Sequence, residues 1–123
     1  MERSEDTATA RRGLEHDTDV LVRQVDSHLA TLRLAPGRHD VALAELVAEA
    51  LRALLVGTAG ASAADRARVR AAVHYFVLRR DSRRDRRPTR ALTEDLRVVN
   101  RVARELGRDD LVVTYGDLLP EPA

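Results

Sequence analysis

DVALAELVAEALRALLVG, residues 40–57, is the stretch that decides the fold. Its apolar side chains recur three and four positions apart, at Leu43, Leu46, Val47, Ala50, Leu51, Leu54 and Leu55. That spacing places them along one side of an α-helix, because a helix turns once in about 3.6 residues. Asp40 precedes them, and a side-chain oxygen there accepts a hydrogen bond from the free N–H groups of a helix start. The stretch therefore predicts an amphipathic helix that begins after Asp40 and ends at the glycines of residues 57–60.

Three further segments around this helix show helical spacing. From about Arg12 to Leu32, one apolar stripe is formed by Leu14, Leu21, Val25, Leu29 and Leu32. Ser62, with Asp65 three residues later, predicts the start of a third helix. Because residues 69–78 are apolar nearly all round, we expect this third helix to be the central, buried one. Thr93 or a neighbouring residue predicts the start of a fourth helix, and Gly107 its end.

The fourth helix carries its apolar residues on one face, at Leu96, Val99, Val102, Ala103 and Leu106. No segment of the sequence alternates between apolar and polar residues with a period of two. The sequence therefore predicts an all-α protein, a single-domain bundle of four main helices with a short C-terminal element.

Length and composition predict one domain with an aliphatic core. The 123 residues, 44% of them hydrophobic, are enough for one core and too few for two. We expect a flexible N-terminus at residues 1–11, a helical domain at residues 12–119 and a flexible tail at residues 120–123. Within the domain, residues 109–119 form either a short helix or an extended strap.

Several functional classes are disfavoured by what the sequence lacks. There is no cysteine, which excludes disulfides, thiolate metal sites and a cysteine nucleophile. The charged start, MERSEDTATARRG, does not resemble a secretory signal, and no apolar run approaches the roughly 20 residues of a membrane span. The histidines lack the spacing of zinc ligands, and there is no nucleophile elbow or glycine-rich phosphate loop. We therefore expect a cytoplasmic protein with no cofactor and no catalytic activity.

The most unusual feature is an arginine-rich segment, RRDSRRDRRPTR, at residues 79–90. Seven arginines and two aspartates give it a formal charge of +5, in a chain whose net charge is only +1. The arginines are Arg79, Arg80, Arg83, Arg84, Arg86, Arg87 and Arg90. One hypothesis is that they bind the phosphates of a nucleic acid or an anionic lipid, a role that arginine performs well.

The other hypothesis is that the chain's own carboxylates pair with these arginines and order the loop. The candidate carboxylates are Asp81, Asp85, Glu94 and Asp95. The two aspartates within the segment would repel a polyanion, and no known nucleic-acid-binding signature accompanies the arginines. Because the chain has only three aromatic residues, stacking on bases is also poorly supported. Internal pairing is therefore favoured.

The stretch from Val73 to Leu106 resembles the YkvA-like family of small helical bacterial proteins. The matching frame, without a gap, is Tyr75-Phe76, Asp81, Asp85, Pro88 and Glu94-Asp95. The resemblance implies a helix, then a structured loop with two aspartates, then a helix that begins with an acidic pair; the family has no established reaction to carry over. Arg79 and Arg84 replace family prolines and Ala91 replaces the turn glycine, so a ligand shared with the family is in doubt.

The four carboxylates also match the hard oxygen ligands of Mg²⁺ or Ca²⁺. The surrounding positive charge disfavours a dication, so we expect no metal. A small metal-dependent enzyme is therefore the least favoured of three functional hypotheses.

The first hypothesis is a non-catalytic helical module for protein–protein interactions, with a homodimer as one form and the partner unknown. Leu21, Val25 and Leu29 of the first helix are its predicted interface. The alternative is polyanion binding by Arg79–Arg90, with nucleic acid the less favoured partner.

Overall fold

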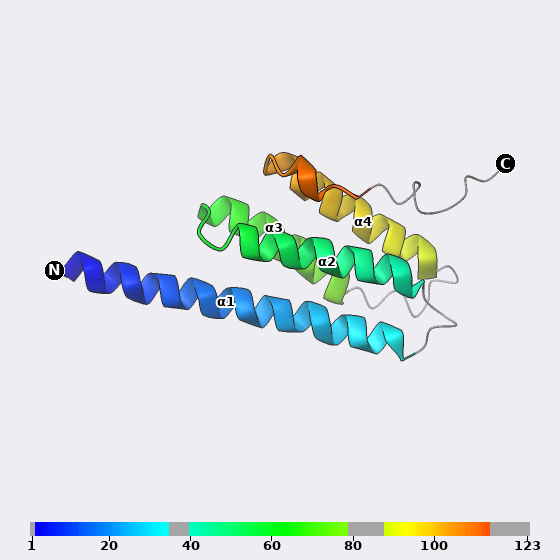
Figure 1. The fold of residues 1–123 in the computed structure, drawn as a ribbon, viewed down its shortest axis with the longest axis horizontal. Helices are drawn as coiled ribbons and strands as arrows, with labels where there is room; N and C mark the ends of the chain where they lie inside the picture. Colours follow the sequence, from blue (N-terminus) through cyan, green and yellow to red (C-terminus); the bar gives the residue numbers. More distant parts are fainter. Residues whose placement is uncertain (1, 35–39, 79–87, 114–123) are drawn as a thin grey trace.

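The computed structural model describes residues 2–34, 40–78 and 88–113, and within these ranges it is entirely helical apart from turns and short connections (Figure 1). The four helices are α1 (Glu2–Arg33), α2 (Val41–Gly57), α3 (Ala63–Leu78) and α4 (Pro88–Glu105), and a 3₁₀ turn, η2 (Asp109–Leu111), follows them. The predicted all-α bundle of four main helices with a short C-terminal element is confirmed.

Successive helices run in opposite directions, and the bundle has α2 and α3 at its centre. α1 packs against both of them from one side, while α4 packs against both from the other side (Figure 1). With 32 residues, α1 is about 48 Å long, whereas the other helices are about 24–27 Å long. The first turns of α1 therefore project beyond the end of the bundle.

α2 is the more buried of the two central helices, so the prediction that α3 is the central, buried helix is wrong as to burial. Eight residues of α2 are buried, namely Leu43, Ala44, Val47, Ala48, Ala50, Leu51, Leu54 and Leu55. α3 buries four, and its last turns leave Tyr75 and Leu78 exposed. The apolar run of α3 misled the prediction because it continues onto the helix surface at these two positions.

The predicted helix ends were right where a capping residue defines them. The Asp40 carboxylate accepts a hydrogen bond from the Leu43 N–H at 3.0 Å, and the Ser62 hydroxyl accepts one from the Asp65 N–H at 3.2 Å. After α4, the N–H of Arg108 donates to the carbonyl of Ala103, and Gly107 adopts a φ of 71°. This arrangement is a Schellman motif, in which glycine is favoured because the left-handed conformation strains other residues.

Two helix starts were predicted too late. α1 begins at Glu2 instead of near Arg12, and residues 2–11 carry no apolar stripe by which the sequence would reveal the helix. α4 begins at Pro88 instead of near Thr93. Proline fits the first position of a helix because its fixed φ is helical and its missing N–H would have no partner there. The flexibility of residues 1–11 and 120–123 stays a prediction.

The core is a single aliphatic cluster to which all four helices contribute. α1 provides Leu21, Val25, Leu29 and Leu32, and α4 provides Leu92, Leu96, Val99, Val102 and Ala103. Among the described residues, Phe76 of α3 is the one fully buried aromatic side chain. None of the helices within the described residues is both long and apolar enough to cross a membrane.

Candidate functional site

Most of the predicted arginine site lies outside the described residues. This holds for the arginines at positions 79, 80, 83, 84, 86 and 87, and for Asp81 and Asp85. Arg90 falls in the first turn of α4, but its side chain is also outside the described part. Pairing between the loop arginines and the loop aspartates therefore stays a prediction.

The acidic pair Glu94-Asp95 does not stand at a helix start. Since α4 begins at Pro88, the pair lies in the second turn of the helix, where Asp95 is buried with 4% of its surface exposed. The described residues contain no group of three or more histidine, aspartate or glutamate side chains that could hold a metal ion.

The predicted interface residues of α1 belong to the core of the single chain. Leu21 is 9% exposed, Leu29 is 3% exposed and Val25 is fully buried, among side chains of α2 and α3. They are not available as a docking surface in this fold, because the chain's own helices cover them. The stripe was recognised correctly, but periodicity cannot tell whether a chain covers its own stripe or offers it to a partner.

An open groove of about 450 Å³ runs between α1 and the last turn of α3. Its lining residues are Val20, Arg23, Gln24, Ser27, His28, Thr31 and Val77. Six of these seven residues are on α1, and they span three turns of that helix. The ring of His28 packs edge-on against Phe76, with 4.7 Å between ring centroids and an interplanar angle of 85°. The groove therefore rests directly on the core through this ring contact.

Sequence reasoning missed this groove although a faint signal is present. Val20, Gln24, His28 and Thr31 each precede a core residue of α1 by one position, so they form a second stripe parallel to the core stripe. The stripe mixes one aliphatic residue with small and polar ones, and such a composition resembles an ordinary solvated helix face. Only the position of α3 shows that this face borders a groove.

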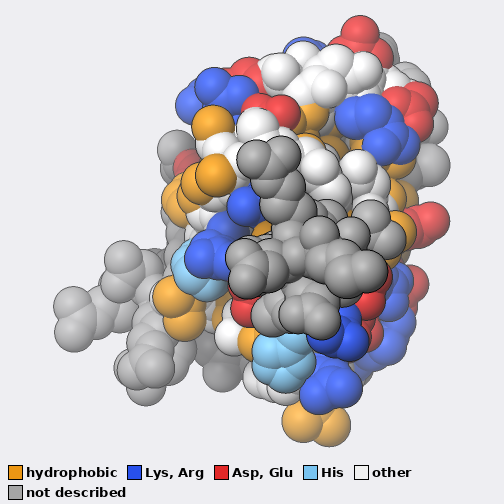
Figure 2. All heavy atoms as spheres, turned by 90° about the vertical axis from the view of Figure 1, so that its left-hand side faces the viewer, with side chains coloured by type: hydrophobic (Ala, Val, Ile, Leu, Met, Phe, Trp, Pro, Cys, Tyr) orange, Lys and Arg blue, Asp and Glu red, His pale blue; other side chains and the backbone are white. Residues whose placement is uncertain are grey.

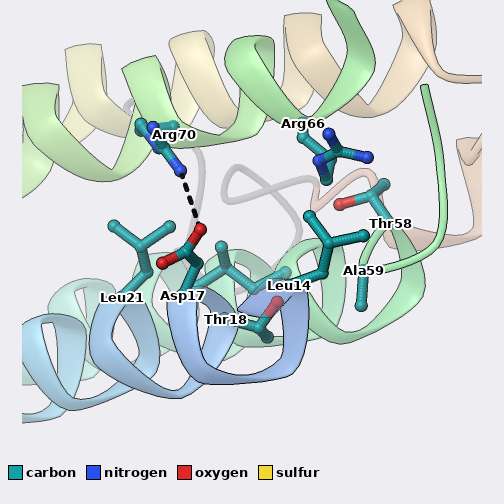
Figure 3. A pocket seen from close by; sticks show the side chains of 9 residues that line it. Leu14, Asp17, Thr18, Leu21, Thr58, Ala59, Arg66 and Arg70 are labelled. Atoms are coloured by element: carbon teal, nitrogen blue, oxygen red, sulfur yellow. Dashed lines mark ion pairs between the residues drawn. The ribbon is translucent and has the colours of Figure 1, made fainter. Parts of the chain in front are cut away.

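A second, smaller cavity of about 30 Å³ lies where α1 passes the end of α2 and the start of α3 (Figure 3). Arg70 of α3 reaches towards Asp17 of α1 across it, with 3.9 Å between guanidinium nitrogen and carboxylate oxygen. Arg66 donates a hydrogen bond to the carbonyl of Ala61, and the buried Thr58 hydroxyl donates to Leu54 at 2.6 Å. Because Asp17, Arg70, Arg66 and Thr58 already have partners and the cavity is only about 30 Å³ in volume, it is a poor ligand site.

Charges of both signs are mixed at the end of the bundle from which the first turns of α1 project. Figure 2 shows arginines and carboxylates interspersed over the surface, with hydrophobic side chains between them. A mixed surface of this kind creates no strong field of one sign, and exposed ion pairs within it contribute little to stability, about 0–1 kcal/mol each. The side chains that the structure describes at this end therefore form no patch of a single charge sign.

The outer face of α4 is different, because it carries three arginines and sequence reasoning missed them as a group. Arg97, Arg101 and Arg104 are exposed, and none of them forms an ion pair or hydrogen bond with another described side chain. Their spacing of four and three residues places them on one side of the helix. The spacing is present in the sequence, but spacing alone does not tell whether carboxylates of other helices pair with the three arginines.

Asn100, on the same helix, anchors the chain segment that follows η2. Its side-chain amide donates a hydrogen bond to the carbonyl of Val113 at 2.8 Å, and its carbonyl accepts one from the Val113 N–H at 3.0 Å. Leu111, Val112 and Val113 pack partly buried against the core. The C-terminal element is therefore a 3₁₀ turn followed by an extended strap, at least as far as Val113.

Arg108 and Asp110 form a two-point ion pair beside η2. Two guanidinium nitrogens donate to the two carboxylate oxygens, both at 3.0 Å. The hydrogen bond from Arg108 holds the pKa of the Asp110 carboxyl below its ordinary value. The pair fixes the turn after α4 and leaves Arg108 less available to a ligand than the three arginines of the outer face.

Comparison of the chain with models of protein families, with curated proteins and with solved structures finds no match, so the resemblance to the YkvA-like family stays an expectation from sequence.

Proposed function

We propose that the chain is a non-catalytic interaction module that self-associates, with two copies pairing through the groove between α1 and α3. The observation that carries the proposal is the groove itself. It is open and about 450 Å³ in volume, and it is lined along three turns of one straight helix. A groove of this shape accepts another helix, which is a common way for helical proteins to recognise partners.

The residues of the groove are self-complementary if two α1 helices pair in antiparallel fashion about a two-fold axis. With the axis midway between Gln24 and Ser27, Gln24 lies opposite Ser27 of the second copy and Val20 lies opposite Thr31. The small Ser27 permits close approach near the axis. The Thr31 hydroxyl already donates to the carbonyl of Ser27 at 3.1 Å, so this hydroxyl keeps a hydrogen-bond partner when it is covered. A two-fold axis is the usual symmetry of small homo-oligomers.

The size of the contact sets the expected affinity. Residues 20–31 extend over about 16 Å of helix, so a pairing confined to them falls at the low end of stable interfaces. We therefore expect a weak dimer that dissociates on dilution, in the range of about 1–100 µM.

Light scattering across protein concentration tests the proposal. The wild-type chain should approach the mass of two copies at high concentration, and Ser27→Glu should remain at the mass of one, because the substitution places two carboxylates near the axis. Ala42→Glu is the matched control, since it adds the same charge at an exposed position on α2 outside the groove. A monomer at every concentration, or equal dissociation by both variants, would contradict the proposal.

Crosslinking gives an independent test, because the chain has no cysteine of its own. A single Ser27→Cys variant treated with a short bis-maleimide should yield a covalent dimer. Asp26→Cys should not, because Asp26 lies about 100° from Ser27 around α1, on the side where it pairs with Arg52 of α2. Crosslinking of Asp26→Cys alone would place the contact on another face of α1 and refute the groove as its site.

A further inference from the structure

The outer face of α4 carries a straight row of arginines. Arg97, Arg101 and Arg104 fall within about 60° of one another around the helix and extend over about 10 Å along it. All three are exposed, whereas the opposite face of α4 is buried in the core through Leu96, Val99 and Ala103. The row is therefore held on a rigid element and points away from the bundle.

These arginines differ from most others that the structure describes, which are paired with the chain's own carboxylates. Arg33 pairs with Glu45 at 3.1 Å and Arg52 pairs with Asp26 at 2.9 Å. Glu105, the last residue of α4, pairs with Arg68 of α3, with 3.6 Å between guanidinium nitrogen and carboxylate oxygen.

The arrangement of the row is also unfavourable for the helix by itself. Like charges four residues apart on a helix repel each other, as Arg97 and Arg101 do. Arg101 and Arg104, three residues apart, are similarly close. Local features that oppose folding are expected where a surface serves a ligand, and an anion bound along the row would remove the repulsion.

We propose that the outer face of α4 binds the phosphate backbone of double-stranded nucleic acid without reading the bases. Arginine forms two parallel hydrogen bonds with a phosphate, and successive arginines along a helix match a backbone of closely spaced phosphates. The proposal does not depend on self-association, because it concerns the opposite side of the bundle from the groove.

A duplex fits this surface better than a single strand or a membrane. Single-strand binding relies on aromatic side chains that stack on bases, and the described part of α4 has none. An interfacial membrane helix needs an exposed apolar face, but the apolar face of α4 is already buried in the core. What the face offers is fixed positive charge, and this suits the regular phosphates of a duplex.

Fluorescence anisotropy with a labelled duplex of about 20 base pairs, in increasing salt, tests the proposal. The key variant is Arg97→Gln with Arg101→Gln. The matched control is Arg12→Gln with Arg52→Gln, which removes the same charge from an exposed position on α1 and from a half-buried position on α2 that is paired with Asp26. Thermal melting of each variant verifies that it is folded.

We expect the α4 variant to weaken duplex binding about tenfold at low salt and to reduce the slope of log K against log salt by about 1.8, because two phosphate contacts are lost. The control should bind like the wild type. If both variants weakened duplex binding equally, the attraction would be a general effect of net charge, and the outer face of α4 would not be the site. An absence of duplex binding at low salt would also refute the proposal.

Three further measurements distinguish this site and this ligand from the alternatives. The first uses a variant with Arg83→Gln and Arg84→Gln. If this variant loses duplex binding while the α4 variant keeps it, the binding site lies in residues 79–90 and not on α4. Tighter binding to a single strand of the same sequence would overturn the choice of a duplex. Binding to phosphatidylglycerol vesicles without binding to duplex would replace nucleic acid with a membrane as the ligand.

Discussion

Replacing Asn100 with alanine removes both hydrogen bonds that hold the strap at Val113 against α4. Each of these partly buried hydrogen bonds contributes about 0.5–1.5 kcal/mol, so their loss costs about 1–3 kcal/mol. Alanine is the better helix former by about 0.5 kcal/mol, which offsets part of the loss. The free energy of unfolding should therefore fall by about 0.5–2.5 kcal/mol.

Thermal and urea unfolding measure this change, with Arg101→Ala as the control. For a chain of this size, 1 kcal/mol corresponds to about 3–5 °C in the melting temperature. Arg101 is exposed on the same helix and forms no hydrogen bond or ion pair with another described side chain, so its replacement should change stability by less than about 0.5 kcal/mol. Asn100→Asp is a sharper test, because a carboxylate still accepts from the Val113 N–H but repels the Val113 carbonyl.

Hydrogen exchange at the Val113 amide supplies a local measurement. In the wild type this N–H donates to Asn100, so it should exchange slowly compared with solvent-exposed amides, and the alanine variant should abolish that protection. Equal melting temperatures for Asn100→Ala and Arg101→Ala, with unchanged exchange at Val113, would refute the reasoning that the amide anchors the strap.

Further predictions concern the core, a helix cap and an ion pair. Val25→Asp buries a carboxylate at a position with no exposure, which costs several kcal/mol, so circular dichroism should show loss of the helical fold and not a folded monomer. Asp40→Ala removes the cap of α2 and should lower the free energy of unfolding by about 1 kcal/mol in urea titration, while Ala42→Ser should have little effect. Because Arg108 lowers the pKa of Asp110, their pair stabilises the fold above the carboxyl's unfolded-state pKa of about 3.9 and ceases to do so as the pH falls through the lower folded-state value. Asp110→Asn should therefore be slightly less stable than the wild type at neutral pH and equal to it in strong acid, and a constant difference across pH would contradict this account.

The helices that the sequence predicted well are those whose determinants are local. Asp40, Ser62 and Gly107 act on backbone groups within a few residues, so their effects do not depend on the rest of the fold. The core stripe of α2 is similarly unambiguous, since an apolar face of that width has to be covered in water. These features together led to the correct fold class.

The errors arise where the same pattern has two physical outcomes. The local sequence around Pro88 is compatible both with the end of a loop and with the start of a helix, and here Pro88 begins α4. The apolar face of α1 is either an interface or part of the core, and the outcome depends on whether α2 and α3 cover it.

The candidate surfaces were missed for a related reason. Ser27 borders a groove only because α3 lies beside it. Arg97 stands out only because none of the carboxylates that the structure describes pairs with it.

The two proposed surfaces have a joint consequence, because α1 and α4 lie on opposite sides of the central helices (Figure 1). Pairing through the α1 groove would place two α4 faces on the outside of a dimer, directed away from each other. Such a dimer would hold two duplexes at once, with an avidity beyond that of one face. Energy transfer between donor-labelled and acceptor-labelled duplexes should then rise with wild-type protein and vanish with Ser27→Glu, while a single duplex still binds each monomer. If Ser27→Glu abolished binding of the single duplex as well, the groove itself would be the nucleic-acid contact, and the separation of the two surfaces would be wrong.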